Sequence, residues 1–325
     1  MFTLSELLKY TRTAITRVGL DLEKMLIVLI MILLILPLLE LNPYIYHLII
    51  LSLMFAVMAA AWVILAIAGP VSLGHATYFG IGAYFTYFAM SKWGLSSYSA
   101  LMIAILVSVT VSVFFSFITF RYGIAGIYFA LVTIAFAEIL RQLFISFREI
   151  TGGSLGVFLM VREPTPLHFL YDSKIPYYYF LIAVYIALYV ITRYILNKFI
   201  LVLRVIGNDE LTAASMRVNI LRYKMLAFSF SALICSLMGW FYIHYFRYIT
   251  PDVAFGLLTS VEIVVIGLLG GLSVIGALIA SLILIPLGEM LRALWGGIYA
   301  GLHVMIYGAI LMTLVILRSL RIKKG

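Results

Sequence analysis

Arg204-Val205-Ile206-Gly207-Asn208-Asp209-Glu210-Leu211-Thr212-Ala213-Ala214-Ser215-Met216-Arg217-Val218-Asn219 is a polar, charged stretch in the middle of an otherwise apolar chain. Asn208 or Asp209 can cap a helix whose first turn is acidic, and the Ala-rich residues that follow favour helix until Asn219 ends it. We therefore expect a short helix outside the membrane, a rigid peg that a partner can push. A solvated loop is the simpler alternative.

The composition around this stretch indicates a membrane protein. Of 325 residues, 65% are hydrophobic and 11% are charged, and the mean hydropathy is +1.17. A soluble domain has about 45–50% apolar and about 25% charged residues. The expected fold class is therefore an all-α polytopic membrane protein. The net charge of +9 does not indicate nucleic-acid binding, because basic and aromatic residues do not alternate along any segment.

Ten apolar runs, separated by polar gaps and turn residues, predict about ten transmembrane helices. Three of them are short for a span of about 20 residues and lie beside glycines, which predicts short, glycine-broken helices. The runs cover residues 25–41, 46–68, 77–90, 99–120, 124–145, 176–196, 223–246, 255–269, 274–290 and 298–317.

The distribution of basic residues predicts the topology. With both termini inside, fifteen Lys and Arg residues flank the inner side and seven the outer side, which favours cytoplasmic termini in the cell membrane. We divide the chain into an amphipathic cytoplasmic tail (1–24), a transmembrane domain (25–317) with a cytoplasmic loop (197–223), and a basic cytoplasmic tail (318–325). The tail at 1–24 can lie on the lipid surface or be frayed.

Two glycine-rich joins suggest an internal repeat. Ser72 and Gly74 lie in the first join, with Gly80 and Gly82 just after it, and Gly270-Gly271 forms the second. The two halves would be inverted relative to each other, and paired broken segments mark the pathway in inverted-repeat carriers. The glycines can allow close helix packing or a broken helix whose free N–H groups face a substrate anion.

Few residues in the apolar runs can carry chemistry. Glu138 with Arg141, and Glu289 with Arg292, have the spacing of ion pairs within one helix, whereas Glu262 has no such neighbour and can either line a polar route or be structural. His75 in the first join can cap the next helix, bind exposed carbonyls or donate to a carboxylate. We expect no catalytic set and no metal site, since no His, Cys and carboxylate residues share a ligand spacing.

Two further features concern partners. No Lys is followed by Ser or Thr, so the chain lacks a nucleotide phosphate loop, and any ATP-driven motor is a separate chain. A glycine turn predicted on the outer side can dock a delivery protein, gate the outer mouth or simply join two helices. It contains Thr151, Gly152, Gly153 and Ser154.

Several motifs together resemble one family. Ser72-Leu73-Gly74-His75-Ala76-x-Tyr78-Phe79-Gly80-Ile81-Gly82-Ala83-Tyr84 is similar to the SLGHAxFFGIGAY motif of branched-chain amino acid ABC transporter permeases of the LivM type. The outer Thr151-Gly152-Gly153 resembles their TGG motif. The central polar stretch resembles their coupling loop, and residues 251–271 resemble their late segment. The resemblance spans about residues 45–317.

The resemblance implies a permease with about ten helices that performs no catalysis and needs no cofactor of its own. Its implied partners are membrane lipid, a sister permease subunit, two cytoplasmic ATPase subunits that bind ATP, and an extracytoplasmic substrate-binding protein. It implies a coupling helix at about 209–218 that docks into the ATPase. The expected coupling residues are Gly207, Asp209, Glu210, Ala213, Arg217 and Asn219.

The sequence departs from this family at a few positions. The coupling loop usually has an acid where Ala214 stands and Gly where Arg217 stands. The expected function is import of branched-chain or other hydrophobic amino acids; the alternative is an ABC permease for urea, short amides or another small polar solute. An intramembrane enzyme would need convergent polar residues at one depth, which the sequence lacks. An ion-driven carrier would need no coupling helix.

Overall fold

The computed structural model describes residues 23–39, 42–160 and 168–295, together with residues 305, 308, 309, 312 and 313. These residues are almost entirely helical, and seven of their helices are long and apolar enough to cross a membrane. The all-α polytopic fold class is therefore confirmed. The tails 1–22 and 318–325 and most of the tenth run (298–317) lie outside the described residues, so the count of ten and the repeat stay predictions.

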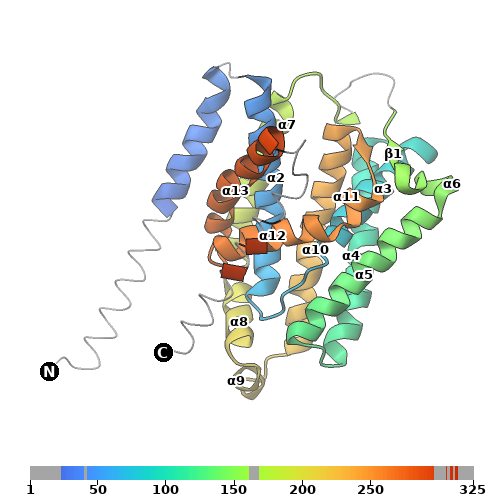
Figure 1. Ribbon diagram of the computed structural model, residues 1–325. Helices are drawn as coiled ribbons and strands as arrows, with labels where there is room; N and C mark the ends of the chain where they lie inside the picture. Colours follow the sequence, from blue (N-terminus) through green and yellow to red (C-terminus); the bar gives the residue numbers. More distant parts are fainter. Residues whose placement is uncertain are drawn as a thin grey trace.

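The helices follow the apolar runs in order (Figure 1). Residues 23–35 are helical. The elements after them are the 3-10 turn Leu36–Leu39, α2 (Pro43–Ala66), α3 (Ala76–Tyr87) with a π turn (Phe88–Lys92), α4 (Ser97–Arg121), α5 (Gly126–Ser146), α6 (Arg148–Thr151), a 3-10 turn (Gly153–Leu155), β1 (Val157–Phe158), α7 (Ile175–Val190) with a π turn (Ile191–Ile195), α8 (Asn197–Asn208), α9 (Glu210–Ser215), α10 (Ile220–Phe246), β2 (Tyr248–Ile249), α11 (Pro251–Phe255), α12 (Leu257–Leu269) and α13 (Val274–Trp295).

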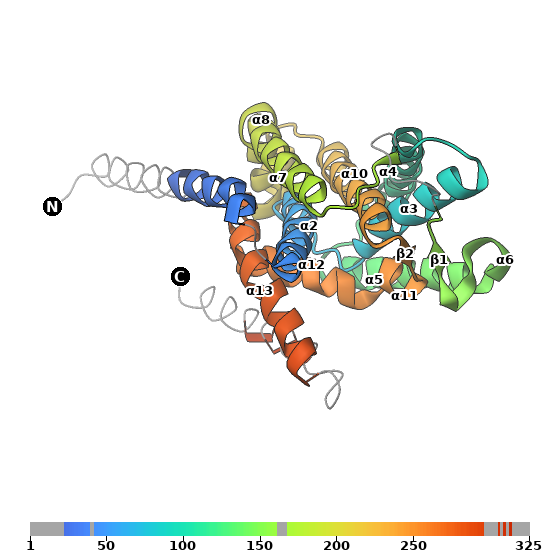
Figure 2. The ribbon, with the colours of Figure 1, turned by 90° about the horizontal axis from the view of Figure 1, so that it is seen from above.

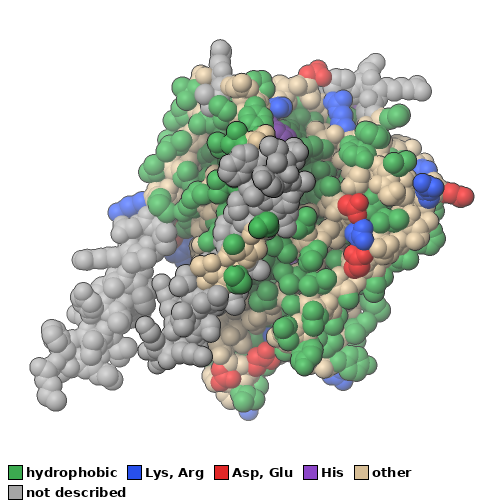
Figure 3. Space-filling model, viewed as in Figure 1, with side chains coloured by type: hydrophobic (Ala, Val, Ile, Leu, Met, Phe, Trp, Pro, Cys, Tyr) green, Lys and Arg blue, Asp and Glu red, His purple; other side chains and the backbone are tan. Residues whose placement is uncertain are grey.

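Helix α2 forms the centre of the bundle. It contacts α7, α10, α12 and α13, which surround it in both ribbon views (Figures 1 and 2). Nearly every residue from Ile50 to Leu65 is buried, and a helix that is apolar on all sides belongs in the interior. Hydrophobic side chains also cover much of the outer face, where charged groups form only a few clusters (Figure 3).

Helices α3 and α10 pack through glycines on both partners. A Cβ atom on Gly82 would lie 2.2 Å from the Ser236 carbonyl oxygen, and one on Gly239 would lie 2.0 Å from the Phe79 carbonyl oxygen. Only glycine permits this approach of two backbones. Helix α10 has 27 residues, about 40 Å at 1.5 Å per residue, so it runs from α9 to the opposite end of the bundle (Figure 1).

The structure corrects three expectations about local structure. The central polar stretch is two helices, α8 and α9, because Asp209 has an extended backbone with φ −158°. Asn219 does not end α9; its side chain accepts a hydrogen bond from the Arg222 N–H and caps α10. The ninth run is not short, since α13 continues to Trp295, whereas α3 is short as expected.

Candidate functional site

Helix α9 is held at its start by the Asp209 carboxylate. One oxygen accepts from the Leu211 N–H at 3.0 Å, and the other accepts from the Thr212 N–H at 3.2 Å and from the Thr212 hydroxyl. The Thr212 hydroxyl, followed by the Leu211 N–H, lowers the pKa of Asp209 below its ordinary value, because these donors stabilise the charged form. The predicted N-cap is therefore confirmed.

The end of α9 forms a Schellman motif. The Val218 N–H donates to the Ala213 carbonyl oxygen at 3.2 Å, and the Arg217 N–H donates to the Ala214 carbonyl oxygen at 2.9 Å. Arg217 has the left-handed φ of +58°, a conformation that glycine adopts at no steric cost. A glycine at this position would therefore adopt the same backbone conformation without strain.

A buried lysine joins α9 to α10. The Lys224 Nζ lies 2.5 Å from the Glu210 Oε1, with side-chain exposures of 8% and 53% respectively. The same ammonium lies 5.6 Å from the centre of the Phe120 ring on α4, within the range of a cation–π interaction. The sequence indicated Glu210 as a coupling residue, whereas Lys224 stood only in the motif that follows the polar stretch and was not selected as a site residue.

Two large apolar side chains are exposed on α9 and at its C-terminal end. Leu211 is 82% exposed and Met216 is 64% exposed, while Ala213 points inward and is fully buried. Behind α9, a Cβ atom on Gly207 would lie 2.0 Å from the Ile67 carbonyl oxygen, so α8 packs directly against the end of α2. The short helix α9 therefore protrudes from the bundle next to a closely packed contact between α8 and the end of α2 (Figure 1).

Backbone N–H groups of the first glycine turn, residues 69–75, and of the first residue of α3 bind hydroxyl groups of two other helices. The Leu73 N–H donates to the Thr133 hydroxyl of α5 at 3.0 Å, and the Ala76 N–H donates to the Ser260 hydroxyl of α12 at 3.0 Å. The Gly74 N–H donates to the Ser72 hydroxyl at 3.3 Å. These N–H groups are bonded within the protein, so the geometry favours the packing role over an anion site at this turn.

His75 is fully buried and links two serines. Its Nδ1 lies 3.0 Å from the Ser72 Oγ, and its Nε2 lies 2.8 Å from the Ser231 Oγ on α10. His75 occupies the N-cap position of α3, but its side chain makes no capping hydrogen bond. Among the described residues, the ring also contacts neither exposed carbonyls nor a carboxylate, so its hydrogen bonds are to the two serines alone. The sequence did not indicate the contacts of Ser231, Thr133 and Ser260 with this region, because these residues lie in distant helices.

Gly80 and Gly270 are also packing positions, whereas Gly271 has open space around it. A Cβ atom on Gly80 would lie 2.5 Å from the Phe255 ring, and one on Gly270 would lie 2.5 Å from the Ala277 backbone nitrogen. Gly271 has a φ of +65° in the turn between α12 and α13. The joins therefore bring helices together.

The ionisable groups in the apolar runs form mostly surface pairs. Arg141 pairs with Glu138 at 2.7 Å and, across to α11, with Asp252 at 2.6 Å. Arg292 pairs with Glu289 at 2.7 Å. Glu262 borders a narrow gap between α12 and α13 lined by Val265, Ile266, Leu284 and Ile285. No group of His, Cys, Asp and Glu suited to a metal ion occurs among the described residues.

The predicted outer glycine turn is an ordered motif. The Thr151 hydroxyl donates to the Phe147 carbonyl oxygen at 2.8 Å and accepts from the Gly153 N–H at 3.3 Å. Gly152 and Gly153 have φ values of +74° and +60°. The following strand β1 pairs with β2, and Ser154 is exposed. The motif thus fixes the end of α5 against the end of α10.

Comparison with known proteins identifies the family. Residues 44–316 match the family described as "Branched-chain amino acid transport system / permease component". The chain belongs to this permease family. This permease is 27% identical over 255 residues to the high-affinity branched-chain amino acid transport system permease protein LivM of Salmonella typhimurium, and 26% identical to LivM of Escherichia coli.

Each of these matches covers 71% of this permease and 59% of the relative, so the chain matches well under two thirds of its relatives' length. No solved structure matches it. The relatives are transport permeases, and the seven apolar helices make this permease a multi-pass membrane protein.

Proposed function

We propose that this permease is the transmembrane subunit of an ABC importer for branched-chain or other hydrophobic amino acids, and that α9 is its coupling helix. The observation that carries the proposal is the form of α9: a capped, protruding helix with Leu211 and Met216 exposed. Exposed apolar side chains outside the membrane mark a protein interface. A groove on an ATPase subunit would bury them.

The contacts around α9 supply a route for the motion. Glu210 on α9 holds Lys224 on α10, and Lys224 lies over Phe120. The Phe120 ring lies 6.3 Å from that of Phe228, which in turn lies 5.9 Å from the His75 ring. A push on α9 would therefore reach the first glycine turn through packed side chains, a physical route for coupling.

The assembly would contain a second, sister permease, two ATPase subunits and a substrate-binding protein. ATP would bind only to the ATPase subunits, since the chain has no phosphate loop. This arrangement requires α9 and both termini on the cytoplasmic side, in agreement with the excess of basic residues predicted there. Closing of the ATPase dimer would then rock the helices between outward-open and inward-open states.

Charge reversal on α9 tests the proposal. We expect the double variant Glu210→Lys/Arg217→Glu to lose co-purification with the ATPase subunits and to lose ATPase activity stimulated by the binding protein. Lys92→Glu, at an exposed position after α3, is the matched control and should retain both. Wild-type association and activity in the double variant would refute the assignment of α9.

Uptake into proteoliposomes tests the substrate class. The complete complex, with its binding protein and ATP inside, should take up radiolabelled L-leucine. Uptake of urea or short amides without leucine would refute the amino-acid assignment. Uptake by the permease alone would refute the ATP-driven mechanism.

A further inference from the structure

A cavity lies at the end of the bundle opposite α9. Its volume is about 360 Å³, and it lies between the N-terminal end of α2, the segment before α7 and the C-terminal end of α10. Ligand pockets of proteins range from about 300 to 1,000 Å³, so the volume suits a small solute. The residues that line it are His47, Tyr171, Asp172, Ser173, Lys174, Tyr177, Tyr245, Phe246 and Arg247.

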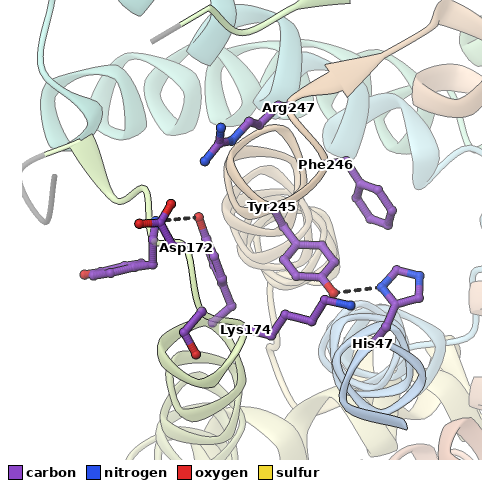
Figure 4. A pocket seen from close by; sticks show the side chains of 9 residues that line it. His47, Asp172, Lys174, Tyr245, Phe246 and Arg247 are labelled. Atoms are coloured by element: carbon purple, nitrogen blue, oxygen red, sulfur yellow. Dashed lines mark hydrogen bonds between the residues drawn. The ribbon is translucent and has the colours of Figure 1, made fainter. Parts of the chain in front are cut away.

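Charges of both signs border this cavity. Arg247 and Lys174 are cationic and Asp172 is anionic. Arg247 and Asp172 are both exposed, and neither has an ion-pair partner within the part of the chain that the structure describes. In Figure 4 the guanidinium of Arg247 points toward the part of the cavity where Asp172 lies. Two unlike charges can therefore meet one ligand.

Two aromatic side chains in the wall contact each other. His47 Nδ1 and the Tyr245 hydroxyl oxygen lie 2.7 Å apart, and the two rings stack with centroids 5.7 Å apart. Lys174 donates to the Pro43 carbonyl oxygen at 3.0 Å, which holds its ammonium beside the cavity and leaves two of its three N–H donors. The Lys174 amine extends toward Tyr245 in Figure 4.

The backbone of Arg247 also has a special conformation. It ends α10 with the left-handed φ of +59°, and its carbonyl oxygen accepts from the Leu159 N–H at 2.9 Å. This pairing, next to the β1–β2 contact, fixes the point from which the side chain departs. The backbone that carries the Arg247 side chain is therefore held in place by hydrogen bonds.

We propose that this cavity is a receiving site for a zwitterionic amino acid on the extracytoplasmic face of the permease. The carboxylate binds Arg247 and Lys174, the ammonium binds Asp172, and the apolar side chain rests on the aromatic wall. The proposal rests on the proposed function, which supplies both the side of the membrane on which the cavity lies and the class of solute that it binds. It adds a site within one permease subunit, far from α9, that holds the solute on entry.

Binding of radiolabelled L-leucine to the permease–ATPase complex in lipid nanodiscs, without the binding protein, tests the site. Leucinol lacks the carboxylate and 4-methylpentanoate lacks the ammonium, so each should compete at least about tenfold less well than leucine, the effect of losing one charged hydrogen bond. Arg247→Gly removes the guanidinium and suits the left-handed backbone, and Asp172→Asn removes the negative charge from an exposed position.

Each variant should weaken one discrimination. Arg247→Gly should bind leucine at least about tenfold more weakly and prefer it to leucinol less strongly, because only Lys174 then binds the carboxylate. Asp172→Asn should no longer prefer leucine to 4-methylpentanoate. Lys92→Gln, an exposed basic position elsewhere, should leave all three affinities unchanged.

Absence of saturable leucine binding, or unchanged preferences in both variants, would overturn the receiving site. So would variants that weaken capture of the binding protein but not of leucine, since the cavity would then be a docking contact. ATP-driven leucine uptake by the wild-type complex is measured in parallel. If uptake is present and the site fails, the proposed function stands; if uptake is absent, the proposed function fails by itself.

Discussion

Replacing Lys224 by Met should loosen α9 locally while leaving the bundle intact. The methionine keeps an apolar stem of similar length beside Phe120 but removes the ammonium that binds Glu210 at 2.5 Å. A hydrogen bond between charged groups contributes about 1.5–3 kcal/mol, whereas an exposed ion pair contributes about 0–1 kcal/mol. Lys224 is buried and Glu210 is 53% exposed, so we expect about 1–2 kcal/mol.

Hydrogen exchange of the α9 amides measures this effect. A loss of about 1–2 kcal/mol corresponds to a 5–30-fold faster exchange. Glu210→Gln should produce a similar change, and the double variant should be no worse than the worse single variant, because both substitutions remove the same contact. Association with the ATPase subunits should weaken in the same order, since α9 would be less well ordered before docking.

Arg222→Met is the matched control, because it removes a positive charge two residues away at an exposed position. It should change neither exchange in α9 nor ATPase association. Equal effects of Arg222→Met and Lys224→Met would refute the reasoning, since a general loss of positive charge would then account for both. Additive effects of the Lys224 and Glu210 substitutions would refute it as well.

Three further substitutions test the packing, with thermal unfolding in detergent as the measurement. Gly82→Ala should lower the free energy of unfolding by about 1–3 kcal/mol, because its Cβ atom would clash with the Ser236 carbonyl. Gly308→Ala is the control, since Gly308 has open space around it, and it should not lower the free energy of unfolding. Equal effects would contradict close packing of α3 and α10. His75→Leu should cost about 1–3 kcal/mol for each of the two buried serines that lose a partner, and an unchanged melting temperature would exclude that role. Arg217→Gly should stabilise α9 by about 0.5–1 kcal/mol, because glycine adopts the left-handed backbone conformation without strain. Arg217→Ala removes the same charge but keeps a Cβ atom, so it should not stabilise α9. Stabilisation by both substitutions would show that the loss of charge is the cause.

Local patterns were sufficient for the membrane class and for the start of α9. A long apolar run must satisfy its own backbone hydrogen bonds in lipid, and a helix does so within one segment. A cap is equally local, because Asp209 binds N–H groups only two and three residues ahead. The end of α9 was misjudged because Asn219 favours the end of one helix and the start of the next equally well.

The contacts of the candidate sites depended on distant residues. The first glycine turn is bound by hydroxyls 60 and 184 residues away, and His75 bonds a serine 156 residues away. Nothing in the sequence near Thr133 distinguishes it from other small polar residues in apolar helices, and the motif that contains Ser260 does not indicate which group its hydroxyl binds. Tertiary packing therefore decided that the N–H groups that this turn leaves outside helical hydrogen bonding bind hydroxyl groups of the protein itself.

The sequence by itself determined that the chain spans a membrane and that its central polar stretch contains a capped helix. Those two features depend on hydrophobicity and on short-range hydrogen bonds. Only the tertiary structure joined Glu210 to Lys224 and placed Arg247, Asp172 and Lys174 around one cavity. Such contacts depend on how helices far apart in the chain pack together. The spacing of hydrophobic residues shows which face of a helix is buried, but not which other helix covers that face.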